Sequence, residues 1–274
     1  MPQGIGIETL VTALLLTLFA GMSTGIGALL AFFTKADNKK VLAWAMGLSA
    51  GVMIYVSFME MLPEAIGKLS ETYSGKSGEA YALLGFFGGM GLIALIDFLI
   101  PEAQNPHEEH STACLHTSPE TVAPRRDLHR TGLMLALAIG IHNFPEGMAT
   151  FVSALEGWDI ALPIVAAIAI HNIPEGIAVS VPIYQATGNR SKALVYSLVS
   201  GLAEPAGAVV GALFLLPFWT PVLNGYILAA VAGIMVYISF DELLPGAHQH
   251  GHHHIAITGV ITGLAVMAAS LLLF

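Results

Sequence analysis

Charged side chains are scarce in this sequence. Asp, Glu, Lys and Arg make up 11% of its 274 residues, whereas hydrophobic residues make up 55%. An ordinary soluble domain carries about 25% charged residues, most of them on its surface. The chain lacks the charge for such a surface, which excludes a soluble globular protein. Its few basic residues form no patch and its net charge is −9, so we expect no nucleic-acid partner.

Cysteine is almost absent too, since Cys114 is the only one. A single cysteine excludes an internal disulfide framework. The amino-terminal stretch "MPQGIGIETL" contains no Lys or Arg, and the apolar run that follows is longer than the core of a secretory signal. We therefore interpret this first run as a retained helix.

Long apolar runs are what the sequence has in abundance. Several reach the ~20 residues that a helix needs to cross the hydrocarbon core of a bilayer. We predict an all-α, polytopic membrane protein with a single transmembrane domain over residues 1–274, surrounded by lipid. The eight expected transmembrane helices cover residues 5–33, 40–66, 80–100, 129–153, 159–184, 191–216, 222–245 and 255–274.

The basic residues are divided unevenly between the two ends of these spans. Lys68 and Lys76 lie at one end. The rest lie at the other end, in or beside the connections 1–2, 3–4 and 5–6: Lys35, Lys39, Lys40, Arg125, Arg126, Arg130, Arg190 and Lys192. Cytoplasmic connections carry the excess of Lys and Arg. We therefore expect a multi-pass protein of the cell membrane (the inner membrane of a Gram-negative cell), with both termini outside the cytoplasm.

Two distant segments resemble each other. "AGVMIYVSFMEMLPEA" (50–65) aligns without a gap with "AGIMVYISFDELLPGA" (232–247). They lie in spans 2 and 7, which cross the membrane in opposite directions. Like sequences in inverted spans indicate an inverted repeat, here arranged as 3+2+3, which is typical of secondary transporters with binding sites near the midplane. Chance similarity between apolar helices is the alternative, and the shared Glu and Pro argue against it.

A polar motif occurs twice inside apolar runs, as "HNFPEG" at 142–147 and "HNIPEG" at 171–176. The candidate ligands are His142, Asn143 and Glu146 in the first copy and His171, Asn172 and Glu175 in the second. On a helix, His and Glu four residues apart share a face, so each copy presents an imidazole and a carboxylate together. The proline should bend the helix, and the glycine should let another helix approach closely.

These donors lie near the middle of spans 4 and 5, roughly 20 Å along each helix at ~1.5 Å per residue. Glu204 in span 6 and Met53 in span 2 lie at similar depth. An ionised carboxylate at mid-bilayer costs at least ~2.5–3.5 kcal/mol. A divalent cation would remove this cost, and imidazole, carboxylate and thioether ligands suit zinc and its first-row neighbours. The set has room for two ions that share Glu146 and Glu175. A helix–helix hydrogen bond, or packing in the case of Met53, is the alternative for each residue alone.

Other function classes fit part of the pattern. A zinc protease carries HExxH, whose Glu acts as the base, but Asn follows His in both copies here. A di-metal carboxylate enzyme uses Glu-x-x-His, which is the opposite order. We therefore predict a transporter rather than an enzyme. A membrane protein that senses metal without transporting it stays open as an alternative.

The paired motifs on consecutive spans, the eight spans and the His-containing 3–4 connection resemble the ZIP (Zrt/Irt-like) family of divalent-metal transporters. "MEMLPEA", "GLAEPAG" and "DELLPGA" are similar to its bacterial ZupT-type branch. The resemblance covers essentially the whole chain. It implies import of Zn²⁺, with Fe²⁺, Mn²⁺, Co²⁺ and Cd²⁺ as related substrates, through a binuclear centre between spans 4 and 5. It implies no catalytic cofactor, and it allows a homodimer.

The resemblance also assigns ligands. It gives the first ion to His142, Glu146, His171, Glu175 and Met53. It gives the second ion to Asn143, Asn172, Glu204 and the two shared glutamates.

Acidic residues near the ends of spans extend the predicted path. Glu60 and Glu64 lie toward the outer end of span 2 and could attract incoming cations. Asp97, Asp241 and Glu242 lie toward the inner ends of spans 3 and 7 and could receive the ion before release. Simple contact with water is the alternative for each of them.

Two cytoplasmic connections are rich in histidine. Residues 101–128 contain His107, His110 and His116, and residues 247–254 contain "HQHGHHH". Such tracts bind transition metals weakly and could buffer or sense them, although they are equally compatible with dispensable solvated loops. We expect the longer connection to be disordered.

Overall fold

The computed structural model describes residues 6–33, 39–74, 76–99, 125–214, 216–218, 220–249 and 251–273. These ranges contain helices and no strand, as predicted. The α-helices are α1 (Ile7–Ala31), α2 (Lys39–Val56), α3 (Leu62–Thr72), α4 (Ser77–Leu99), α5 (Arg125–Leu155), α6 (Trp158–Thr187), α7 (Arg190–Gly201), α8 (Ala203–Phe214), α9 (Pro221–Ile238), α10 (Leu244–Gln249) and α11 (His253–Leu273). Three short helices of other types are η1 (Ser57–Met61), η3 (Leu216–Phe218) and η4 (Ser239–Leu243).

Seven stretches of the described chain are long and apolar enough to cross a membrane: Ile7–Ala31, Lys39–Thr72, Ser77–Phe98, Trp158–Val181, Arg190–Phe214, Pro221–His248 and His253–Leu272. Each overlaps one predicted span, so the chain is a multi-pass membrane protein. The remaining predicted span, 129–153, lies within α5, a helix of 31 residues. We attribute its lower hydropathy to the polar motif at its centre and to its basic first turns.

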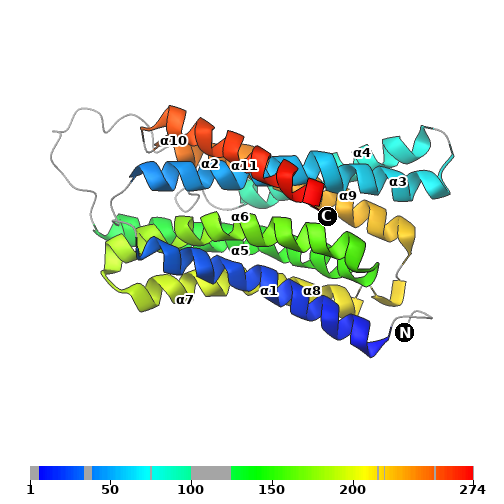
Figure 1. The fold of residues 1–274 in the computed structure, drawn as a ribbon, viewed down its shortest axis with the longest axis horizontal. Coiled ribbons are helices and arrows are strands. Elements are labelled where there is room, and N and C mark those ends of the chain that lie inside the picture. The colour runs from blue at the N-terminus through cyan, green and yellow to red at the C-terminus, as the bar shows by residue number, and fades with distance from the viewer. Residues whose placement is uncertain are drawn as a thin grey trace.

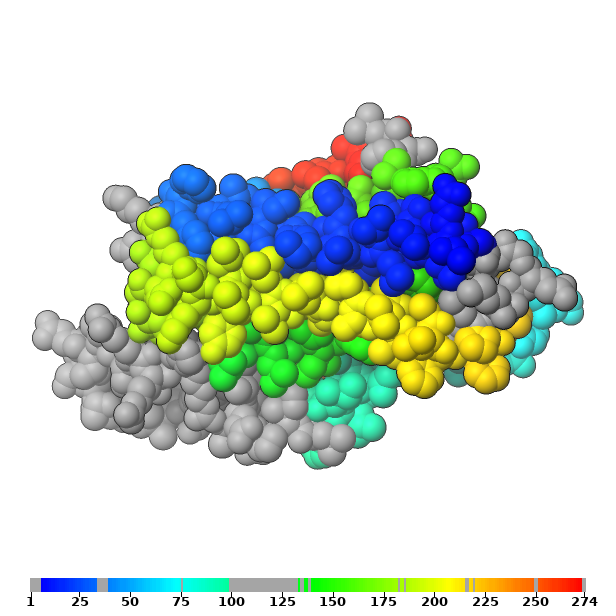
Figure 2. Space-filling model, turned by 90° about the horizontal axis from the view of Figure 1, so that it is seen from below, coloured from blue at the N-terminus to red at the C-terminus, as the bar shows by residue number. Residues whose placement is uncertain are grey.

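The helices form two bundles that lie side by side (Figure 1). The α2 bundle consists of α2, α3, α4, α9, α10 and α11, and the α6 bundle consists of α1, α5, α6, α7 and α8. In the α2 bundle, α2 packs along α11 and α4 packs along α9. In the α6 bundle, α1 packs along α6 and α5 packs along α8. Figure 2 shows α1 (blue) beside α7 and α8 (yellow-green to yellow) on one face. The bundles meet mainly where α2 contacts α6.

Glycines allow the closest helix crossings within each bundle. The pairs are Gly27 and Gly176 between α1 and α6, Gly147 and Gly207 between α5 and α8, Gly51 and Gly263 between α2 and α11, and Gly89 and Gly233 between α4 and α9. A Cβ atom added at any of them would lie 1.8 to 2.2 Å from a carbonyl oxygen of the partner helix. The close approach predicted at Gly147 and Gly176 is therefore confirmed, and a side chain there would push the helices apart.

Two long helices change their hydrogen-bonding pattern for one turn. The π-helices η1 and η4 join α2 to α3 and α9 to α10. Each begins with a serine whose hydroxyl donates to the carbonyl four residues earlier: Ser57 to Met53 at 2.7 Å, and Ser239 to Met235 at 2.8 Å. Both π-turns lie at matching positions of the aligned segments 50–65 and 232–247. Single π-turns inside α-helices are frequent at functional sites.

The prolines of the two polar motifs do not interrupt their helices. The α-helical assignment of α5 and α6 continues through Pro145 and Pro174. The departures from α-helix occur elsewhere, at η1, at η4 and at Leu202 between α7 and α8. The last of these places Glu204 in the first turn of α8.

Candidate metal site

The predicted ligands are all buried where α2, α5, α6 and α8 come together. His142, Asn143, Glu146, His171, Asn172, Glu175, Glu204 and Met53 are each at most 2% exposed. α5 and α6 carry the two copies of the motif and pack against each other. α2 and α8 add Met53 and Glu204 from either side. The sequence therefore identified a set of residues that lie in one buried region.

The two motifs interlock. His142 Nε2 lies 3.3 Å from Glu175 Oε1, and His171 Nε2 lies 2.9 Å from Glu146 Oε1. Each histidine thus approaches the glutamate of the other helix, although the spacing in sequence suggested pairing within each motif. Because the two helices are antiparallel and carry matching motifs, the histidine of each can face the glutamate of the other. These two contacts bring four donors from two helices to one place.

Ser49 and Met53 border this group from α2. The Ser49 hydroxyl lies 3.3 Å from Glu175 Oε1, 3.5 Å from the His171 carbonyl oxygen and 3.9 Å from Met53 Sδ. Met53 itself is fully buried. The thioether therefore lies at the edge of the His–Glu group, where the sequence placed it. Ser49 was not predicted. The one signal for it is its position one helical turn before Met53.

Asn143, Asn172 and Glu204 form a second group on the side of α1, α7 and α8. Asn172 Nδ2 donates to the Ala20 carbonyl at 2.9 Å and also to Glu204 Oε1. Asn143 Nδ2 donates to the Ser200 carbonyl at 3.3 Å. Both amide nitrogens therefore donate hydrogen bonds to protein oxygen atoms, so the amide oxygens are the candidate metal ligands.

Several buried donor atoms of the site have no hydrogen-bond partner in the described ranges: His142 Nδ1, Asn143 Oδ1, both oxygens of Glu146, both ring nitrogens of His171, Asn172 Oδ1, Glu175 Oε2 and Glu204 Oε2. His171 and Glu146 are thus close without the orientation of a hydrogen bond. No Lys or Arg of the described chain forms an ion pair with the three glutamates. Buried carboxylates without compensating charge are costly, so this region favours a cation.

The donors do not yet enclose an ion. Among the described residues, no three His, Cys, Asp or Glu side chains converge in a metal-binding geometry. The histidines and glutamates are directed at one another. Rotations of these side chains are therefore needed before a metal ion can take four ligands.

The predicted path residues lie on both sides of the site. Glu60, in η1, and Glu64, in α3, are half-buried, and a Glu60 carboxylate oxygen is buried with no hydrogen-bond partner in the described ranges. Asp97 and Asp241 both interact electrostatically with Tyr237. Glu242 interacts with His142 in the same way. The structure thus brings Asp97 and Asp241 toward Tyr237 in α9, and Glu242 toward His142 in α5.

The structure describes the two histidine-rich segments to different extents. Residues 101–124 of the predicted loop 101–128 lie outside the described ranges, and residues 125–128 already belong to α5. Within the segment 247–254, residue 250 also lies outside the described ranges, while Gly251, whose φ is +74°, donates its backbone N–H to the His248 carbonyl at 3.0 Å and precedes α11. The rings of His248 and His253 pack there with centroids 4.6 Å apart.

Comparison with known proteins agrees with these features. The family model described as "ZIP Zinc transporter" matches residues 9–97 and 100–271. Zinc transporter ZupT of Streptococcus mutans is 57% identical over 267 residues, which cover 97% of this chain and 99% of that protein. Zinc transporter ZupT of Clostridium perfringens is 51% identical over an alignment of 284 residues that covers both chains fully. That of Akkermansia muciniphila is 49% identical over 268 residues, 98% of this chain and 99% of that one. These relatives are transporters rather than enzymes. The chain belongs to the ZIP zinc transporter family.

Proposed function

We propose that this protein is a secondary transporter that carries Zn²⁺ across the membrane into the cytoplasm. The relatives named above are zinc transporters and match the chain over nearly its whole length. The observation that carries the proposal is the interlocked pair of His–Glu contacts at mid-helix, buried with no described Lys or Arg to neutralise the carboxylates. A transported cation would supply that charge in passing.

The proposed site holds two ions. His142, Glu146, His171, Glu175 and Met53 bind the first, and Asn143, Asn172, Glu204 and the two shared glutamates bind the second. The burial of all these residues supports the assignment, as do the unpartnered donor atoms in both groups. A bound ion would replace the direct His–Glu contacts with metal–ligand bonds. The same donors suit Fe²⁺, Mn²⁺, Co²⁺ and Cd²⁺, which we propose as further substrates.

The proposed architecture is a 3+2+3 inverted repeat. This repeat would relate α1 to α7–α8, α2 to α9, α4 to α11 and α5 to α6. The observed helix contacts fit that relation, because the α1–α6 contact has its counterpart in the α5–α8 contact, and the α2–α11 contact has its counterpart in the α4–α9 contact. The glycines at these contacts correspond in the same way, because Gly147 in α5 matches Gly176 in α6, and Gly51 in α2 matches Gly233 in α9. The matching positions of η1 and η4 support it as well.

Alternating access is the proposed mechanism. The α2 bundle and the α6 bundle move relative to each other and expose the centre first outward and then inward. For the orientation, the support is that α2, α5 and α7 all begin with basic residues, and their first turns lie at one end of the molecule (Figure 1). That end faces the cytoplasm in this proposal, and both termini lie outside. Assembly as a homodimer stays a prediction.

Uptake into sealed proteoliposomes tests transport directly. Wild-type protein should accumulate ⁶⁵Zn²⁺ inside the vesicles, and Glu175→Ala should abolish accumulation while inserting normally. Ser153→Ala, a buried change in α5 away from the donors, is the matched control and should keep uptake. Metal binding without flux would favour a sensor. Near-normal uptake by Glu175→Ala would count against the proposed site.

A further inference from the structure

Lys68 in α3 lies between two carboxylates that belong to different bundles. Its Nζ is 3.3 Å from Glu64 Oε1, one turn earlier in the same helix, and it forms a closer ion pair with Glu156 Oε2. Glu156 lies between α5 and α6, in the α6 bundle. The side chains are 15% (Lys68), 22% (Glu64) and 21% (Glu156) exposed, so this charge cluster is largely shielded from water.

Asn224 completes the cluster from α9. It is fully buried, and its Nδ2 donates to Glu156 Oε1. Its Oδ1 is buried without a hydrogen-bond partner in the described part of the chain. A buried amide oxygen without a partner is destabilising, because folding removes its water. Half a turn of the carboxamide would exchange its nitrogen and oxygen and direct the oxygen toward the carboxylates.

The ligand chemistry of the cluster suits a divalent cation. Two carboxylates carry two negative charges, and the single ammonium of Lys68 neutralises one of them. A divalent ion would neutralise both and would also satisfy the Asn224 oxygen. Lysine has a long, flexible side chain that can extend to water while its methylene groups stay packed. Lys68 is therefore able to withdraw when an ion arrives.

The cluster lies at the end of the molecule that we propose to be the outer one. The end of α3 and the beginning of α9 lie opposite the basic first turns of α2 and α7 (Figure 1). The rings of Tyr73, Tyr81 and Tyr226 gather nearby, with centroid distances of 4.5 and 6.4 Å. Tyrosines are enriched at membrane–water interfaces, so the cluster is within reach of the outer solution.

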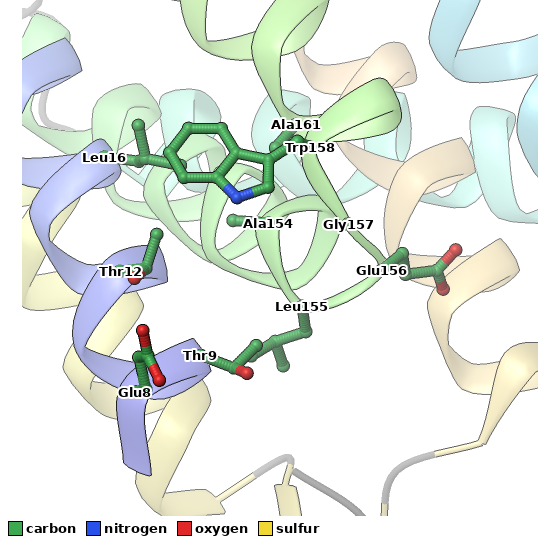
Figure 3. Close-up of a pocket in the computed structure, with 10 residues that line it drawn as sticks. All are labelled: Glu8, Thr9, Thr12, Leu16, Ala154, Leu155, Glu156, Gly157, Trp158 and Ala161. Carbon is green, nitrogen blue, oxygen red and sulfur yellow. The ribbon is translucent and has the colours of Figure 1, made fainter. Parts of the chain in front are cut away.

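Glu156 lines a cavity beside this cluster, but its carboxylate contacts Lys68 and Asn224. A cavity of about 330 Å³ lies between α1 and the α5–α6 connection. In Figure 3 the Glu156 carboxylate points away from Glu8 and Thr12, which line the other side of that cavity. Gly157, with φ +123°, makes the turn after Glu156 that a residue with a side chain would rarely adopt. The connection therefore holds Glu156 against the α2 bundle.

We propose that Glu64, Glu156 and Asn224 form a capture site for an incoming divalent cation, and that the ammonium of Lys68 occupies this site until an ion displaces it. The inference rests on the proposed import function, because it takes the Lys68 end as the entrance. It gives Lys68 the role of a built-in competitor that admits divalent ions and resists monovalent ones. A plain structural ion pair between the bundles would give Lys68 no such effect on metal binding.

The test measures zinc binding without transport. Full-length protein carrying Glu146→Gln and Glu175→Gln, which disable the proposed central site, is titrated with Zn²⁺ by calorimetry in detergent. Adding Lys68→Gln should tighten Zn²⁺ binding at least about tenfold, because a fixed positive charge no longer competes with the ion. Adding Glu156→Gln to that protein should remove the gain. Lys68→Arg keeps the charge and should bind as the background protein does.

A second variant guards against misfolding of the first. Asn224→Asp is nearly isosteric and adds a carboxylate to the cluster, so it should also tighten Zn²⁺ binding in the same background. Equal Zn²⁺ affinities with and without Glu156→Gln in the Lys68→Gln protein would overturn the inference, as would a Lys68→Arg protein that binds as tightly as Lys68→Gln. Wild-type uptake into proteoliposomes is a separate measurement, so failure of the proposed function is distinguished from failure of this site.

Discussion

The imidazole of His171, on α6, lies 2.9 Å from the carboxylate of Glu146, on α5. His142 and Glu175 form the reciprocal contact at 3.3 Å. Each motif therefore contacts the other, so the proposed site needs both "HNFPEG" and "HNIPEG". Zinc bound at this place would be held by both helices at once, so loss of one donor disturbs groups on both.

We predict that changes at Glu146 and His171 are not additive. Glu146→Gln and His171→Asn should each lower zinc uptake about 10- to 100-fold, because each removes a charge or donor that the other needs. The double variant should lose little more than either single variant. Initial rates of ⁶⁵Zn²⁺ uptake by matched amounts of inserted protein measure this. Independent, multiplying losses would show that the two residues act at separate places.

Ser49 should act as a positioning residue for Glu175. Ser49→Ala removes a hydrogen bond to the carboxylate at 3.3 Å, which is worth about 0.5–1.5 kcal/mol. We expect the zinc concentration for half-maximal uptake to rise by a factor of about 2 to 10. Ser180→Ala is the control, since Ser180 is equally buried but its hydroxyl donates to the Ile177 carbonyl, also at 3.3 Å. Identical concentration dependence in the two variants would argue against this role.

Met53 should favour soft cations. The conservative change Met53→Leu keeps the volume but replaces the thioether, which prefers softer metals. Uptake of Cd²⁺ should fall relative to uptake of Mn²⁺ in competition assays. Met235→Leu alters the methionine at the aligned position in α9 and should leave the ratio unchanged. A ratio that is the same in Met53→Leu and wild type would remove Met53 from the proposed ligands.

Glycine at the α5–α8 crossing should be required for stability. A Cβ at position 147 would lie 2.0 Å from the backbone oxygen of Glu204, so Gly147→Ala must separate two helices that carry donors. We expect a loss of about 1–3 kcal/mol, seen as a lower unfolding temperature in detergent, together with reduced uptake. At Gly91, in α4, a Cβ would meet nothing within 4 Å, so Gly91→Ala is the control. Equal melting temperatures for the two proteins would contradict this packing.

Features encoded locally could be predicted from the sequence. Apolar runs gave the positions of the helices to within a few residues at most ends, because hydrophobicity over ~20 residues decides whether a segment crosses a bilayer. The doubled motif predicted a set of polar residues that the structure places in one buried region, and we expected a function for them because a carboxylate at mid-bilayer is costly. Glu64, whose place on the transport path stays a prediction, forms an ion pair with Lys68 that was not anticipated.

Features that depend on packing between distant segments could not be predicted. The histidine of each motif contacts the glutamate of the other because of the way α5 and α6 face each other. The spacing of residues along one helix does not specify that arrangement. The Glu156 carboxylate meets Lys68 and Asn224, which are 88 and 68 residues away in the chain. The π-turns η1 and η4 were not predicted either, although the two segments that contain them were aligned. The similarity of these two segments in sequence does not indicate the hydrogen-bonding pattern of their backbone.

The central claim is that a divalent cation is held between α5 and α6 by imidazole and carboxylate groups. Zinc anomalous scattering from crystals grown with Zn²⁺ tests it most directly. The account predicts zinc density within about 2.0–2.2 Å of nitrogen atoms of His142 and His171 and of oxygen atoms of Glu146 and Glu175. Zinc density only at other places, with the four side chains still paired to one another, would contradict the account.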